Sequence, residues 1–233
     1  MTTNRQSSRP LVADERPFES TPTRSTSEAV WLIGAALCGA ILAFLFARQV
    51  LNEPPMSDSV STLLWYAVRV AGIGAYLMLW LTTVAGLAIS GRFSARWLPG
   101  GLLFPLHQLA DFALLLAALH ASLLLGDRFA GFTPTSLVVP FQASYRPLWT
   151  GFGILALYLM EFVYWSVELR PRIGYRAWRV IHYASFATFG LAMIHGLASG
   201  TDSGSAPMRL MYFLTGLATV ALIYGRWRAT RTR

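Results

Sequence analysis

Six long apolar segments dominate this 233-residue chain and limit what it can fold into. They run over 29–48, 62–90, 101–125, 148–167, 177–198 and 208–225. Each meets or approaches the ~20 residues that cross a hydrocarbon core of ~30 Å. In lipid such segments must be helices, because every backbone polar group needs a partner within its own segment. The sequence therefore predicts an all-α integral membrane protein, a six-transmembrane-helix bundle over residues 29–225.

Charged residues are few and lie at the ends of the apolar segments. They make up 13% of the chain, about half of the ~25% that is usual in soluble domains. The 19 basic residues are all arginines, and they form no single patch, so we expect no nucleic-acid partner. Residues 1–28 are rich in Ser, Thr, Arg and Pro, which predicts a disordered tail. Residues 226–233 form a second, basic tail.

The arginines also predict an orientation, since cytoplasmic loops carry the excess of basic residues. The loop between the second and third segments has Arg92 and Arg96, and the loop between the fourth and fifth has Arg170, Arg172 and Arg176. Four more arginines follow the last segment. We therefore expect both termini in the cytoplasm. The use of arginine without lysine suggests a GC-rich bacterial genome, hence a multi-pass protein of the bacterial cytoplasmic membrane.

All four histidines of the chain lie in predicted membrane helices. His107 and His120 are on the third segment and His182 and His195 on the fifth, each pair 13 residues apart. That spacing is roughly 20 Å along a helix. The two segments run parallel, so His107 shares a level with His182 near the cytoplasm, and His120 with His195 near the outer face.

Two imidazoles at each of two levels suit the axial positions of two haem irons. The sequence thus predicts two haems b between the third and fifth helices, with axial pairs His107/His182 and His120/His195. A spacing of 13 residues leaves the two histidines of one helix about 140° apart around an ideal helix axis. Kinks or locally tighter winding must absorb that difference for both to face one seam.

On these residues the chain resembles the ferric reductase-like transmembrane domain family. That family includes the membrane parts of ferric reductases and NADPH oxidases, and the haem-binding membrane subunit of the bacterial methionine sulfoxide reductase system. The resemblance covers about 29–225 and rests on the six segments and the histidine pattern. The stretches Trp178-Arg179-Val180-Ile181-His182, His195-Gly196 and Gly200-Thr201-Asp202 look like bacterial members.

The resemblance implies electron transfer from the inner to the outer face, by the membrane component of an oxidoreductase. Ferric reductases and oxidases of this family usually carry a flavin and nicotinamide domain after the sixth helix. This sequence has neither that domain nor a GxGxxG motif, so we expect no flavin or NAD in this chain. Electrons would then come from a separate cytoplasmic flavoprotein reductase or membrane quinol. They would go to a ferric chelate or a partner enzyme outside.

Three charged residues are candidates for contacts around the haems. Arg179, one turn before His182, and Arg69, about two turns inside the second helix, are candidates for pairing with haem propionates. For Arg69 the alternative is a pair with another helix, because a lone membrane arginine is costly. Asp111, four residues after His107, is a candidate acceptor for the second ring nitrogen of that histidine or a partner for an arginine.

Two other function classes remain open at the level of sequence. A transporter would use the membrane histidines and Asp111 to move protons or metal ions, and would need a polar lumen that few other residues supply. A membrane anchor subunit for a soluble oxidoreductase would need no cofactor and would tolerate replacement of all four histidines.

Overall fold

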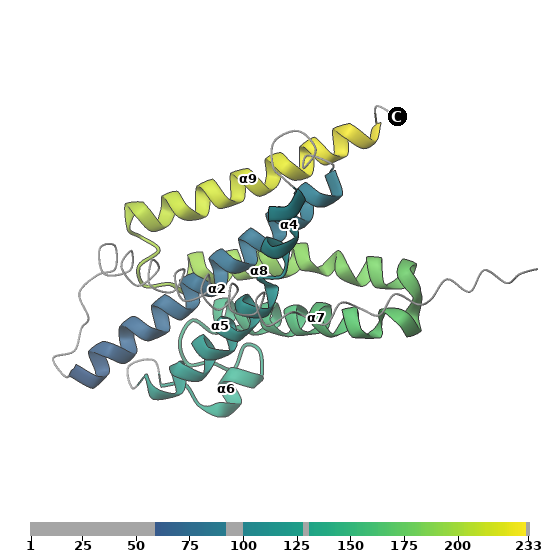
Figure 1. Cartoon of the computed structure of the whole chain (residues 1–233). Helices are drawn as coiled ribbons and strands as arrows, with labels where there is room; N and C mark the ends of the chain where they lie inside the picture. The colour runs from purple at the N-terminus through teal and green to yellow at the C-terminus, as the bar shows by residue number, and fades with distance from the viewer. Residues whose placement is uncertain (1–58, 92–99, 128–130, 232–233) are drawn as a thin grey trace, which may run out of the picture.

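The described part of the protein consists of helices joined by short connections. The structure is a computed structural model, and it describes residues 59–91, 100–127 and 131–231 (Figure 1). These ranges contain no strand. The helices are α2 (Ser59–Gly91), α4 (Gly100–His107), α5 (Ala110–Leu123), the 3₁₀ turn η1 (Leu124–Gly126), α6 (Pro134–Val138), α7 (Pro147–His182), α8 (Ala184–Ser199) and α9 (Ala206–Arg231). The predicted all-α fold class is therefore confirmed for these residues.

Four helical stretches are long and apolar enough to cross a membrane. They are Ser59–Ser90, Pro105–Gly126, Pro147–Ser199 and Ala206–Ala229. They overlap five of the predicted segments, because the third stretch takes in both 148–167 and 177–198. The segment 29–48 and the tail 1–28 lie outside the described residues, as do Arg92 and Arg96, so the count of six stays a prediction. Most of the predicted basic tail continues α9 as helix, up to Arg231.

Gly174 joins two helices within α7. Its backbone has φ 78° and ψ 160°, a conformation that is open to glycine and avoided by residues with a Cβ. The chain reverses there, and the second part of α7 runs back beside the first and leads into α8 (Figure 1). The resulting pair of antiparallel helices, α7 and α8, has one of the most extensive contacts in the structure. This reversal is what returns His182 and His195 toward the rest of the bundle.

The backbone is wound more tightly just after His107 and just after His182. After His107 the chain makes three i→i−3 hydrogen bonds, from Gln108 N to Pro105 O at 3.1 Å, from Leu109 N to Leu106 O at 3.3 Å and from Asp111 N to Gln108 O at 3.4 Å. After His182, Tyr183 N similarly reaches Val180 O at 3.2 Å. A 3₁₀ turn advances the side-chain direction by about 120° per residue instead of about 100°. Both breaks thus rotate the two histidines of a helix toward a common face, as the 13-residue spacing requires.

Helix α2 is the central element and packs against α4, α5, α8 and α9. The core lies along it, around Ile73, Tyr76 and Leu79, which meet residues of α5, α7, α8 and α9. Tyr76 also shares a buried hydrogen bond of 2.6 Å with Thr215 of α9. This arrangement places α2 alongside α4 and α5, which carry His107 and His120.

Candidate functional site

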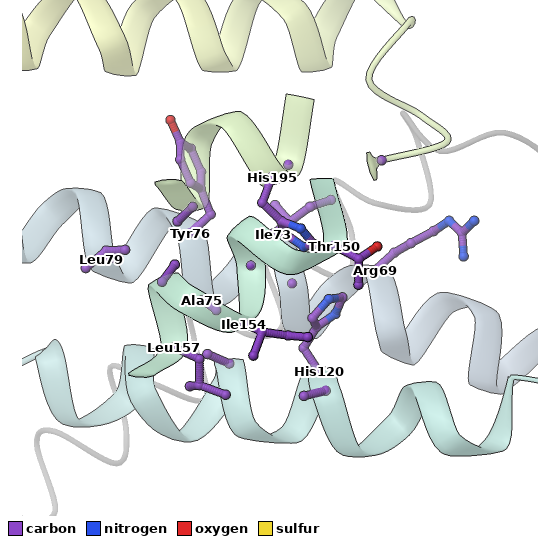
Figure 2. Close-up of a pocket in the computed structure, with 18 of the residues that line it drawn as sticks. Arg69, Ile73, Ala75, Tyr76, Leu79, His120, Thr150, Ile154, Leu157 and His195 are labelled. Atoms are coloured by element: carbon purple, nitrogen blue, oxygen red, sulfur yellow. The ribbon is translucent and has the colours of Figure 1, made fainter. Parts of the chain in front are cut away.

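The structure brings the four histidines together as two facing pairs. The ring centroids of His107 and His182 are 5.9 Å apart, with 71° between the ring planes. Those of His120 and His195 are 6.3 Å apart, with 74° between the planes. Figure 2 shows His120 and His195 projecting from opposite sides into the same space. These are the pairings that the sequence predicts.

The spacing of each pair suits a metal that brings its own further ligands. A metal bound by one nitrogen of each ring at about 2 Å separates the two ring centroids by about 6 Å. Within the described ranges, no group of three or more His, Cys, Asp or Glu side chains is placed to hold a metal ion. A pair of imidazoles without further protein ligands fits a haem iron, whose porphyrin supplies the four equatorial nitrogens.

Backbone carbonyls hold the Nδ1 atoms of three of the histidines. His120 Nδ1 lies 2.8 Å from the carbonyl oxygen of Val68, and His107 Nδ1 lies 3.1 Å from that of Thr82. His195 Nδ1 lies 2.9 Å from the carbonyl oxygen of Trp149. A carbonyl only accepts hydrogen bonds, so each Nδ1 must carry the proton. This leaves the unprotonated Nε2 as the nitrogen available to bind a metal.

His182 is held differently. Its Nδ1 is buried and has no hydrogen-bond partner within the described part of the chain. Its ring instead stacks on Trp178, with centroids 4.9 Å apart and 26° between the planes. The ring of His182 is thus held by a neighbouring side chain, whereas backbone carbonyls hold the other three rings.

A cavity adjoins the outer pair. Its volume is about 210 Å³, and it is partly open to the outside. This is smaller than the ~300–1,000 Å³ that ligand pockets usually measure. The two histidines line it together with small and apolar residues of α2, α5, α7 and α8, among them Gly72, Ala75, Ala113, Ala117, Gly153, Ala156 and Ala192. Small side chains on four helices leave room beside the two imidazoles.

Arg69 is paired within the protein, as its alternative role requires, although its partners lie in the connection after α8 and not in a helix. Its Nε donates to Asp202 Oδ2 at 2.8 Å, and its Nη2 donates to Thr201 Oγ1 at 2.7 Å. Both partners follow α8, and the guanidinium also lies 3.5 Å from the ring centroid of Trp65. Arg69 and Asp202 are among the residues that line the cavity.

Arg179 contacts a tyrosine in the structure, and Asp111 is not the acceptor at Nδ1 of His107. Arg179 is exposed and donates from Nε to Tyr183 Oη at 3.0 Å. At His107 the acceptor for Nδ1 is the Thr82 carbonyl, so the backbone fills the role expected of Asp111. The cause is the break in the helix, because α4 ends at His107 and α5 begins at Ala110. The four-residue spacing therefore does not put the two side chains on one continuous helical face.

Sequence reasoning missed the residues that receive the imidazole rings. Gly72, Gly86 and Gly153 lie directly against His120, His107 and His195. A signal was available in part, since Gly72 and Gly86 are 14 residues apart and so share a face of α2. Phe189, which lies about midway between His182 and His195 in the sequence, is part of the core and stacks on Tyr76 with centroids 5.8 Å apart.

No protein-family model, curated protein or solved structure matches this chain. The resemblance to the ferric reductase-like family therefore rests on the residues that suggested it.

Proposed function

We propose that this chain is a membrane cytochrome b that carries single electrons through two haems, from a donor on the cytoplasmic side to an acceptor outside. The observation that carries the proposal is the presence of two pairs of facing imidazoles, whose ring centroids are 5.9 Å apart in one pair and 6.3 Å apart in the other. When bound, the haem iron supplies one-electron oxidation and reduction. The protein supplies ligands, orientation and surroundings.

The histidines and their carbonyl partners define the kind of site. At each level two protein imidazoles would hold the haem iron and would leave no position for an outside ligand, which would favour electron transfer over chemistry on a bound molecule. The carbonyls of Val68, Thr82 and Trp149 fix the tautomer of three ligands and the direction of their rings. Fixed ligands reduce the rearrangement that accompanies a change of charge at the metal.

The surroundings of the outer pair also favour a bound cofactor over ion transport. The cavity is lined mostly by alanine, glycine and aliphatic side chains, and its charged lining residues, Arg69 and Asp202, are paired with each other. An apolar lining excludes water from the site, and it offers few groups to replace the hydration of a passing ion.

The proposal includes the topology that the sequence predicts. Six helices, cytoplasmic termini and a bacterial cytoplasmic membrane put the His107/His182 pair on the cytoplasmic side. A flavoprotein reductase or membrane quinol would deliver electrons there. The His120/His195 pair would pass them to a ferric chelate or a partner enzyme on the outer face. The two levels together carry the electron across the apolar core.

The test is a reduced-minus-oxidised absorption spectrum of the detergent-purified protein, with a pyridine haemochrome count. We expect a b-type spectrum and about two haems per chain. His120→Leu and His107→Leu should each lower the count to about one, because each removes one ligand of one pair. Leu119→Ala is the control, since this exposed neighbour of His120 should leave the count unchanged. A colourless protein from cells that supply haem would refute the proposal.

A further inference from the structure

Three of the four imidazoles lie against a glycine of a neighbouring helix. A Cβ on Gly72 would meet His120 Nδ1 at 2.9 Å, and one on Gly153 would meet His195 Nδ1 at 2.6 Å. A Cβ on Gly86 would meet His107 Cε1 at 3.1 Å. Real Cβ atoms rarely approach other atoms so closely, so a side chain at these positions would displace the ring.

Each of these glycines stands four residues after the carbonyl that the ring contacts. The carbonyls belong to Val68, Thr82 and Trp149, and the glycines are Gly72, Gly86 and Gly153. In an α-helix, carbonyl i already accepts from the N–H of residue i+4, and its second lone pair faces outward beside that residue. Without a side chain at i+4, an imidazole can lie flat on the helix and donate to that lone pair. We call this arrangement a glycine seat.

The two seats on α2 match the two histidines of the facing helix. Gly72 and Gly86 are 14 residues apart, which places them about 40° apart around α2 and about 21 Å apart along it. His107 and His120 are 13 residues apart, and the tight turn after His107 rotates them toward one side. One regular helix therefore receives both rings on one face. The third seat, on α7, receives His195 of α8.

We propose that Gly72, Gly86 and Gly153 are positioning residues that hold three histidines with the proton on Nδ1 and with Nε2 free to bind the haem iron. The identity of the metal rests on the proposed function. The positions of the three rings and the proton on Nδ1 rest on contacts within this chain. His182 is the exception, because it has no seat in the described part of the chain and is held by its stack on Trp178. The four ligands are thus three seated histidines and one stacked histidine.

Glycine-to-alanine variants test the role in binding. Gly72→Ala and Gly153→Ala should each lower the haem count from about two to about one, with loss of the outer haem. Gly190→Ala is the matched control, because Gly190 is also helical and a Cβ there meets nothing within 4 Å. It should keep both haems. Retention of both haems with unchanged spectra in Gly72→Ala and Gly153→Ala would overturn the inference while leaving the proposed function standing.

The hydrogen bonds at Nδ1 test the seats beyond the haem count, because every imidazole bound to iron through Nε2 carries its proton on Nδ1 whether or not it has a seat. Nitrogen-15 histidine NMR on the purified full-length protein, reduced with dithionite so that low-spin iron is diamagnetic, distinguishes an Nδ1–H that donates a hydrogen bond from one that does not. We expect protonated, hydrogen-bonded Nδ1 atoms at His107, His120 and His195, with the His195 signal lost or shifted in Gly153→Ala. Fewer than three such signals in the wild-type protein would overturn the inference, even where a glycine variant fails to fold. Three such signals in a protein without haem would uphold the seats and refute the proposed function.

Discussion

Arg69 and Asp202 form an ion pair that joins the middle of α2 to the connection between α8 and α9. Arg69 Nε lies 2.8 Å from Asp202 Oδ2, and the side chains keep only 17% and 6% of their surfaces exposed. Both residues line the cavity that contains His120 and His195. The pair therefore fixes the α8–α9 connection to the helix that carries the seat of His120.

Removal of the Asp202 carboxylate should destabilise this end of the bundle. In Asp202→Asn the half-buried Arg69 loses its counter-charge, and breaking one partner of a buried pair costs about 3 kcal/mol. For a chain of this size, that lowers the thermal midpoint by roughly 10 °C. Thermal unfolding of the detergent-purified protein measures the shift. Glu168→Gln, at an exposed position of α7, should change it little, and an equal midpoint in both variants would contradict the structural role.

Hydropathy predicts the apolar helices well, but it predicts poorly where a helix ends and where the chain reverses. The apolar segments 62–90, 101–125 and 208–225 correspond to continuous or nearly continuous helical stretches. The sequence places a loop around Pro171, whereas the helix continues through Pro171 and reverses at Gly174. The reason is local, because proline keeps a helical φ and glycine alone adopts the φ of 78° that turns the chain.

Alanine at Gly174 should strain this reversal. A non-glycine residue at φ 78° and ψ 160° costs about 1–3 kcal/mol. We expect Gly174→Ala to lower the thermal midpoint by roughly 5 °C. Gly190→Ala is the control, because Gly190 has a helical backbone and open surroundings. Alanine there should leave the stability unchanged or raise it by up to ~1 kcal/mol. A loss of stability in Gly190→Ala alone would contradict the assigned conformations.

In the candidate site, the sequence predicts the histidines but not the groups that hold their rings. The histidines have the same spacing on two parallel helices, and this predicts which of them face each other. Hydrogen-bond acceptors at Nδ1 are backbone carbonyls, which every residue has, so no residue type marks Val68 or Trp149 in the sequence. Asp111 looks suitable because of its spacing from His107, but that spacing spans a helix break.

The stack of Trp178 on His182 should matter at the inner site alone. Aromatic stacking contributes ~0.5–1.5 kcal/mol, so Trp178→Ala should weaken haem binding at the His107/His182 pair by up to about tenfold. The orientation of the His182 ring should also change, which alters the electron paramagnetic resonance signal of one low-spin haem. Trp165→Ala, at an exposed position of α7, should leave both signals unchanged. A change confined to the signal of the outer haem would contradict the assignment.

Filling the outer cavity should exclude the outer haem while leaving the fold intact. Ala117 lines the cavity three residues before His120, and a phenylalanine there would occupy the space beside the imidazole pair. Its neighbour Ala118 is exposed and is not among the residues that line the cavity, which makes Ala118→Phe a matched control with the same change in volume. We expect the haem count to fall from about two to about one in Ala117→Phe and to stay at about two in Ala118→Phe. Size-exclusion chromatography should show both variants as monodisperse as the wild type. A full haem count in Ala117→Phe would place the outer haem somewhere other than this cavity.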